Sequence, residues 1–199
     1  MCPWFNSRWH HRKPLIFQGL FRFKTMQTKQ EIRTYVKQQR KALSVTDSDT
    51  MSAAIMERIA ACGEFGAATT VLAYWPLPGE VDTRSLILAG GRRFVLPVVC
   101  GDDLLLKVYD QSRMREGAFG ILEPDESAET VAPEEIDFAI IPGMAFSPDG
   151  MRLGRGRGFY DRLLGSLHCV KAGVAFPFQI FDELPADPWD LPMDLVVTP

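Results

Sequence analysis

The length, composition and charge of the chain are those of a globular protein without a strongly basic surface. It has 199 residues, of which 46% are hydrophobic and 24% are charged, and its formal net charge is −3. These proportions favour a soluble fold with one sizeable core, and the acidic balance argues against binding of nucleic acid through overall charge. The four cysteines lack C-x-x-C spacing, so neither a zinc ribbon nor a disulfide scaffold is indicated. No apolar run approaches the roughly 20 residues that span a bilayer, and we expect a cytoplasmic protein that does not contact a membrane.

The first 25 residues differ from the rest of the chain. They contain no Asp or Glu, and their apolar stretches are too short for a signal peptide. A segment with helical periodicity opens at Met26. We therefore expect an N-terminal extension over residues 1–25, either a disordered tail or the product of an upstream translation start, and a single domain over residues 26–199. N-terminal mass analysis of the native protein tests this expectation.

Helices and strands alternate along the predicted domain. Helices are expected over 27–43, from a cap at Asp49 or Thr50 to Ala61, and from Asp82 or Thr83 to about Ala89, with a turn at 44–48. Strands are expected at 69–74, 93–99, 104–109, 138–141, 171–176 and 195–198, and loops at 75–80, 117–125 and 177–189. This alternation favours a mostly parallel α/β sheet with helices on both faces. Because ligands bind such sheets at the carboxyl ends of strands, we expect the loops after Tyr74, Ile141 and Phe176 on one rim.

An arginine- and glycine-rich segment at 152–158 is the main candidate for chemistry. It stands between the strand at 138–141 and a helix that begins at Phe159, which is an order in which α/β proteins build anion sites. Glycine lets a ligand approach the main chain, and a guanidinium group matches phosphate or carboxylate oxygens. The spacing differs from both the P-loop and the dinucleotide fingerprint. The pattern leaves open an anion site and a loop that contacts RNA or no ligand.

Other polar residues allow more than one interpretation. Lys29 and Arg33 share one helix face, and their spacing alone favours an exposed, solvated pair. Glu80 follows a strand, where it either orients a polar ligand or pairs with Arg84. Asp161, in the first turn of a helix, either interacts with the helix dipole or holds Mg²⁺ beside bound phosphates.

The residues from Pro142 to Asp161 resemble the signature of the 5-formyltetrahydrofolate cyclo-ligase family. They read P-G-M-A-F and then G-x-R-L-G-R-G-x-G-F-Y-D. Further segments agree in order, namely K-x-x-x-R at 29–33, Y-x-P-x-x-x-E-V-D-T at 74–83, L-P-V at 96–98, G-I-x-E-P at 120–124 and W-D-x-P-x-D at 189–194. The resemblance covers about residues 27–198.

The resemblance implies a fold, a reaction and a set of partners. The fold would be a three-layer α/β sandwich with a mostly parallel sheet, of the ribose-5-phosphate isomerase/CoA-transferase type. The reaction would be the ATP- and Mg²⁺-dependent conversion of 5-formyltetrahydrofolate to 5,10-methenyltetrahydrofolate. ATP would phosphorylate the formyl oxygen, N10 would attack the same carbon, and phosphate would leave. The partner would be a reduced folate rather than nucleic acid or a membrane, and we expect a monomer.

The resemblance also implies roles for individual positions. ATP would be bound by Lys29, Gln30, Glu31, Ile32, Arg33, Arg152, Leu153, Gly154, Arg155, Gly156, Arg157, Gly158, Phe159 and Tyr160. The folate would contact Trp75, Glu80, Arg155, Gly156, Arg157, Gly158 and Phe159. The catalytic residues would be Arg155, Arg157 and Tyr160, and the Mg²⁺ ligands would be Asp161 and Asp190. For Lys29 and Arg33 the resemblance overrides the expectation from spacing.

Three positions depart from the family pattern. Phe159 stands where the family often has Tyr, Trp189 stands where His is common, and Arg157 occupies a variable Gly or Lys position. Two rival functions remain: a phosphosugar or CoA-type enzyme that uses the loop without ATP hydrolysis, and an RNA-binding Arg-Gly protein, whose RNA affinity would depend steeply on salt.

Overall fold

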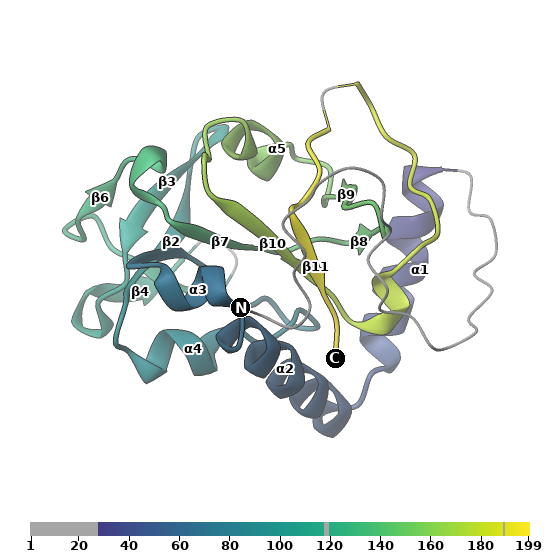
Figure 1. The fold of residues 1–199 in the computed structure, drawn as a ribbon, viewed down its shortest axis with the longest axis horizontal. Coiled ribbons are helices and arrows are strands. Elements are labelled where there is room, and N and C mark those ends of the chain that lie inside the picture. Colours follow the sequence, from purple (N-terminus) through teal and green to yellow (C-terminus); the bar gives the residue numbers. More distant parts are fainter. Residues whose placement is uncertain (1–27, 118–119, 189) are drawn as a thin grey trace.

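A seven-stranded sheet forms the centre of the computed structural model, which describes residues 28–117, 120–188 and 190–199 (Figure 1). The strand order is β11 (Leu195–Val197), β10 (Val170–Val174), β7 (Phe138–Ile141), β1 (Thr70–Leu72), β2 (Arg93–Cys100), β3 (Asp103–Val108) and β6 (Thr130–Val131). The strands from β11 to β2 are parallel, whereas β3 and β6 pair antiparallel at one edge. The expected α/β fold with a mostly parallel sheet is therefore confirmed. The predicted extension and Trp189 lie outside the described residues.

Helices cover both faces of the sheet (Figure 1). They are α1 (Lys29–Ala42), α2 (Val45–Ala60), α3 (Gly63–Ala67), α4 (Arg84–Ala89) and α5 (Phe159–Leu164), with short 3₁₀ turns η1 (Gln111–Arg113), η2 (Pro133–Glu135) and η3 (Pro177–Gln179). Side chains of α2, α3 and α4 pack against one face, and those of α5 against the other. In the described part of the chain, no helix is long and apolar enough to cross a membrane.

The central strands are buried on both faces. Every residue of β1 and β7 is buried. Phe138 and Ile140 of β7 join the core on the α2 side, whereas Ala139 and Ile141 join the core on the α5 side. Parallel strands covered on both faces read as continuous apolar runs, and the three resulting layers agree with the expected sandwich.

A third, smaller core attaches α1 to a hairpin that follows the carboxyl end of β7. Ile32 and Val36 are fully buried against Met144, Leu153 and Phe181. The hairpin consists of β8 (Ala145–Phe146) and β9 (Arg152–Leu153). A capping box fixes the start of α1, because the Thr28 hydroxyl oxygen accepts a hydrogen bond from the Glu31 backbone and the Glu31 carboxylate accepts one from the Thr28 backbone. The first turn of α1 is thereby held beside the hairpin.

Two of the expected element boundaries are wrong. The turn predicted at 44–48 is the start of α2, because the Ser44 hydroxyl accepts a hydrogen bond from the Asp47 backbone at 3.1 Å and caps the helix there. The loop predicted at 117–125 contains β5 (Leu122–Pro124), which pairs antiparallel with β4 (Met114–Glu116). The third predicted helix is α4, which begins at Arg84, near the predicted place. The Asp82 carboxylate accepts a hydrogen bond from the Arg84 backbone N–H.

Candidate active site

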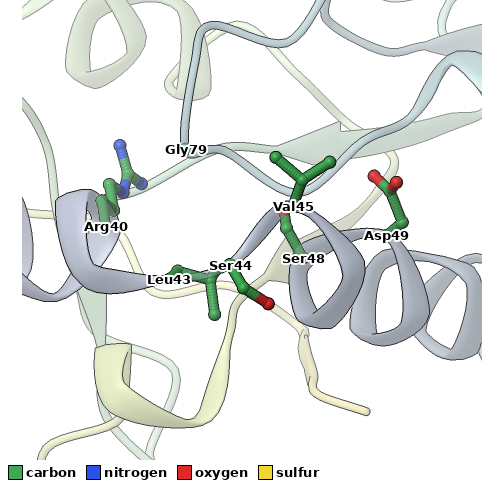
Figure 2. Close-up of a pocket in the computed structure, with 7 residues that line it drawn as sticks. All are labelled: Arg40, Leu43, Ser44, Val45, Ser48, Asp49 and Gly79. Carbon is green, nitrogen blue, oxygen red and sulfur yellow. The ribbon is translucent and has the colours of Figure 1, made fainter.

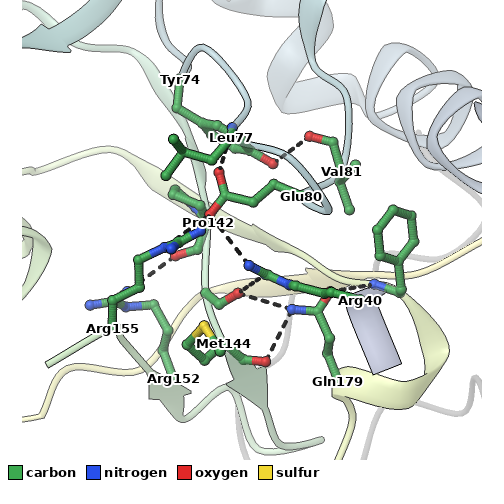
Figure 3. Close-up of polar contacts among 12 residues, drawn as sticks. Arg40, Tyr74, Leu77, Glu80, Val81, Pro142, Met144, Arg152, Arg155 and Gln179 are labelled. Carbon is green, nitrogen blue, oxygen red and sulfur yellow. Dashed lines mark hydrogen bonds and ion pairs between the residues drawn. The ribbon is translucent and has the colours of Figure 1, made fainter. Parts of the chain in front are cut away.

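The loops after β1, β7 and β10 meet at the carboxyl end of the sheet (Figure 3). The loop after β1 carries Glu80, the loop after β7 carries Gly143, and the loop after β10 carries Gln179. The Gln179 side-chain amide donates to the carbonyl oxygens of Gly143 at 2.9 Å and Met144 at 3.0 Å, and its own oxygen accepts from the Phe176 backbone at 3.0 Å. The three loops therefore share one rim, as expected from the strand order.

Glu80 lies at the centre of this rim between two arginines. Its Oε1 accepts from Arg155 Nη2 at 2.7 Å and from Nε at 3.3 Å, and Arg40 Nη1 lies 3.6 Å from the same oxygen. Its Oε2 accepts from the Leu77 backbone at 3.1 Å. The side chains of Glu80 and Arg40 are only 6% and 8% exposed, whereas Arg155 is 48% exposed. A buried carboxylate thus joins a buried cation to an accessible one.

The alternative pairing of Glu80 with Arg84 is not what the structure shows. Arg84 instead forms an ion pair of 2.6 Å with Asp82. The sequence-predicted folate residue Glu80 and the sequence-predicted phosphate residue Arg155 are therefore direct neighbours, although 75 residues separate them in the chain.

Arg152, the first residue of the arginine-glycine segment at 152–158, is buried. Its guanidinium donates to the Asp161 carboxylate and, at 3.1 Å, to the Pro142 carbonyl oxygen, and it lies 5.5 Å from the centre of the Tyr160 ring. Only 4% of the Arg152 side chain is exposed. Arg152 therefore holds Asp161 and the start of α5 in place, while Arg155 and Arg157 occupy the exposed part of the segment.

Lys29 and Arg33 on α1 both make contacts with distant parts of the chain. Arg33 Nε donates to the Gly154 carbonyl oxygen at 2.9 Å, and Lys29 Nζ donates to Asp187 at 2.6 Å and to Asp190 at 3.0 Å. The expectation from spacing, an exposed solvated pair, is wrong, because Arg33 is bonded to the segment at 152–158 and Lys29 is bonded to Asp187 and Asp190.

The other predicted positions on α1 and β9 have different surroundings. The Ile32 and Leu153 side chains lie in the core, Glu31 caps the helix, and Gln30 is exposed. The side chains of Lys29 and Arg33 reach the candidate site from α1.

Main-chain geometry in the segment depends on glycine. Gly156 and Gly158 have φ angles of 101° and 72°, in a region that residues other than glycine rarely adopt. A Cβ built on Gly156 would lie 3.5 Å from the Arg33 guanidinium carbon. The main chain therefore runs closely past the cation of α1.

Two carboxylates predicted to hold Mg²⁺ are each bound to a cation. Asp161 is held by Arg152, and Asp190 is held by Lys29 and by the Asp187 backbone N–H at 2.8 Å. Burial acts to raise the pKa of Asp190, but the Asp187 N–H and the Lys29 ammonium outweigh it and lower that pKa. The positive charge of Arg152 lowers the pKa of Asp190 further, so both acids lie within the field of one guanidinium.

Metal binding at this place does not require a larger cluster. Over residues 28–117, 120–188 and 190–199, no three or more His, Cys, Asp and Glu side chains converge. Mg²⁺ at phosphate sites is commonly bound through one or two carboxylates together with phosphate oxygens and water. The assignment of Asp161 and Asp190 as ligands stays a prediction.

Aromatic side chains border the polar cluster. Trp75, in the loop after β1, stacks on Tyr109 with ring centres 6.0 Å apart and an angle of 23° between planes. Tyr160 is half-buried; burial and then the negative charge of Glu80 raise its pKa well above the ordinary value, against the effect of Arg152. A phenol is protonated at neutral pH even with its ordinary pKa, so Tyr160 can donate a hydrogen bond.

A separate pocket lies at the junction of α1 and α2 (Figure 2). It has a volume of about 140 Å³ and is lined by Arg40, Leu43, Ser44, Val45, Ser48, Asp49 and Gly79. None of these is a predicted ligand or catalytic residue. Two of its lining residues adjoin Glu80: Arg40 forms an ion pair with it, and Gly79 precedes it in the chain. No residue of the arginine-glycine segment lines the pocket.

Comparison with known proteins agrees with the signature. The model of the 5-formyltetrahydrofolate cyclo-ligase family matches residues 25–199. The chain belongs to this family. Cyclo-ligases that it resembles include those of Escherichia coli K12, with 34% identity over 175 residues (82% of this chain and 96% of the relative), and Haemophilus influenzae, with 30% identity over 183 residues (86% and 98%).

Solved structures of cyclo-ligases have the same fold. The 5,10-methenyltetrahydrofolate synthetase of Aquifex aeolicus superposes with a TM-score of 0.78 and 38% identity, covering 85% of this chain and 88% of that one. The synthetase of Mycoplasma pneumoniae gives 0.69 and 29%, covering 85% and 98%. Cyclo-ligase membership favours the predicted enzyme over the phosphosugar, CoA-type and RNA-binding alternatives.

Several residues at the rim formed by the loops after β1, β7 and β10 were not predicted from the sequence. Arg40, Tyr109 and Gln179 all contact predicted site residues or their loops. A signal for Arg40 was present, because it follows Arg33 by seven residues and therefore lies on the same side of α1, about two turns further along. We find no comparable signal for Tyr109 or Gln179.

Proposed function

We propose that this cyclo-ligase converts 5-formyltetrahydrofolate to 5,10-methenyltetrahydrofolate at the expense of ATP, with Mg²⁺ required and ADP and phosphate released. The observation that carries the proposal is the contact between Glu80, assigned to the folate, and Arg155, assigned to phosphate, within a chain of this family. The contact supports adjacent sites for the two substrates. Adjacency is what transfer of a phosphoryl group to the formyl oxygen requires.

The chemistry explains why ATP is needed. A formamide carbonyl is a weak electrophile, and its oxygen is a poor leaving group. Phosphorylation of that oxygen activates the carbon for attack by N10, and the oxygen then departs as phosphate. The protein's task is to place the formyl oxygen in line with the γ-phosphate and to offset developing charge.

The nucleotide would lie along the arginine-glycine segment. Arg33 borders this segment from α1, and Lys29 lies about one turn earlier on the same helix, bonded to Asp187 and Asp190. The glycine main chain allows close approach of phosphate oxygens. Arg155 is sufficiently exposed to turn from Glu80 to a phosphate. We assign it, together with Arg157, to stabilisation of charge on the transferred group, and Tyr160 to donation of a hydrogen bond there.

The folate would bind against Trp75 and Glu80. A carboxylate accepts hydrogen bonds from neighbouring N–H groups, and the pterin edge presents such groups side by side. Trp75, supported by Tyr109, offers an apolar surface for the ring.

The donor set fits a magnesium ion beside the nucleotide. Asp161 and Asp190 are carboxylates that both lie within the field of Arg152, the first residue of the arginine-glycine segment. Carboxylates, phosphate oxygens and water are the ligands that Mg²⁺ prefers. When bound, the ion would neutralise phosphate charge during transfer.

The proposal is tested by following the absorbance of the methenyl-folate product. We expect product to accumulate from 5-formyltetrahydrofolate only when ATP and Mg²⁺ are both present, with one ADP and one phosphate formed per product. Pure, folded protein that gives no turnover under these conditions would refute the proposal. Sedimentation of the same preparation tests the expected monomer.

A further inference from the structure

Arg40 is a buried arginine at the active-site rim that the family signature leaves without a role. Its aliphatic stem packs so closely on Gly79 that a Cβ built on that glycine would lie 3.0 Å from Arg40 Cβ. Arg40 Nη2 donates to the Gly143 carbonyl oxygen at 2.9 Å, and Nη1 lies 3.6 Å from Glu80 Oε1. Arg40 thus contacts the loop that carries Glu80 and also the loop after β7 (Figure 3).

The two arginine partners of Glu80 differ in their freedom to move. Arg155 is 48% exposed, and the bonds found for its guanidinium among the described residues are those to Glu80. Arg40 is 8% exposed, and its guanidinium is also bonded to the main chain. A ligand that attracts Arg155 can therefore remove it from Glu80, whereas Arg40 stays.

Removal of Arg155 would leave Glu80 dependent on its remaining contacts. A carboxylate that is 6% exposed is costly to leave without an opposite charge. Arg40 supplies that charge, while the Leu77 backbone N–H, at 3.1 Å from Oε2, fixes the second oxygen. The carboxylate then presents a defined edge to incoming N–H groups.

We propose that Arg40 is a positioning residue of the folate site: it holds the Glu80 carboxylate in place while Arg155 exchanges Glu80 for a phosphate oxygen. This inference rests on the proposed function, which assigns Glu80 to the folate and Arg155 to the nucleotide. It adds a residue that does not itself touch either substrate.

The test is a kinetic comparison of Arg40→Met and Arg40→Lys with the unmodified protein. Methionine keeps an apolar stem against Gly79 and removes the guanidinium. We expect the KM for 5-formyltetrahydrofolate to rise about 10- to 150-fold in Arg40→Met, the range for one hydrogen bond from a charged group; here that bond, to the Gly143 carbonyl oxygen, fixes the guanidinium beside Glu80. We expect the KM for ATP to change less than about threefold and Arg40→Lys to recover part of the folate affinity.

Arg92→Met is the matched control. Arg92 is another partly buried arginine that donates to backbone carbonyl oxygens, those of Gly66 and Ala68, and covers the Phe65 ring at 4.6 Å. It stands just before β2, at the opposite end of the sheet. We expect both KM values to be unchanged in this variant, even where its melting temperature falls.

A double-mutant cycle with Glu80→Gln decides whether Arg40 acts through Glu80. We expect Arg40→Met to add little to the folate KM once Glu80 is already glutamine. An undiminished effect in that background, equal changes in the KM for folate and ATP, or a failure of both Arg40→Met and the double variant to fold would each overturn the inference. Absence of turnover in the unmodified protein would instead refute the proposed function.

Discussion

Replacement of Arg155 by alanine is expected to reduce activity strongly while leaving the stability of the fold almost unchanged. Arg155 contacts Glu80 at 2.7 Å and 3.3 Å but is half-exposed, so solvent screens the pair and its contribution to stability is at most about 1 kcal/mol. Arg40 remains beside Glu80 after the replacement. We therefore expect Arg155→Ala to fold with a nearly unchanged melting temperature.

The expected kinetic loss is much larger than the loss of stability. One hydrogen bond from a guanidinium to a charged oxygen contributes about 1.5–3 kcal/mol. If Arg155 makes this bond only in the transition state, kcat/KM falls about 10- to 150-fold, and kcat falls with it. The assay is the growth of methenyl-folate absorbance with each substrate varied in turn.

A second arginine supplies the control for Arg155. Arg93 at the start of β2 pairs with Glu129 at 2.5 Å and with Glu135 at 3.1 Å, far from the carboxyl end of the strands. We expect Arg93→Ala to leave both kinetic constants unchanged. A folded Arg155→Ala variant with unaltered kcat and KM would refute the reasoning, because Arg155 would then be only a surface ion pair.

Two further predictions concern stability. Asp190 has a pKa below the ordinary 3.8, because the Asp187 N–H and the Lys29 ammonium outweigh the effect of burial; its stabilising contribution is complete above 3.8 and is lost as the pH falls through the lower folded-state pKa. Asp190→Asn should therefore lower the melting temperature near neutral pH but not in strong acid, and a difference that persists at low pH would contradict this. Gly150→Ala should destabilise by about 1–3 kcal/mol more than Gly90→Ala, because both glycines have positive φ but only the Cβ at Gly150 would meet a backbone oxygen, that of Met193, at 2.4 Å. Denaturant titration measures the two alanine variants, and equal losses would show that the clash relaxes.

The apolar strands were predicted well because their pattern is local. The prediction of 138–141 matches β7 residue for residue, since a strand buried on both faces is a short continuous apolar run. The predicted start of α2 was wrong because Ser44, Asp49 and Thr50 are all acceptable N-caps. The buried residues of α2, from Ser52 to Ile59, follow all three and so do not distinguish between them.

Most of the site could be assigned only through the family signature. Lys29 and Arg33 looked solvated because their partners lie 158 and 121 residues away in the chain, and helical spacing carries no information about such contacts. The pairing of Glu80 with Arg155 and Arg40 has the same origin: it depends on how the loops after β1 and β7 fold over α1.

The attachment of α1 to the β8–β9 hairpin has a consequence for biosynthesis. Ile32 and Val36 leave the ribosome early, but Met144 and Leu153, which cover them, follow roughly 110 residues later, a delay on the order of 5–20 s at ordinary translation rates. During that interval the apolar side of the nascent helix is exposed to water and to chaperones. The proposed sites for nucleotide and folate are therefore complete only when almost the whole polypeptide has been made.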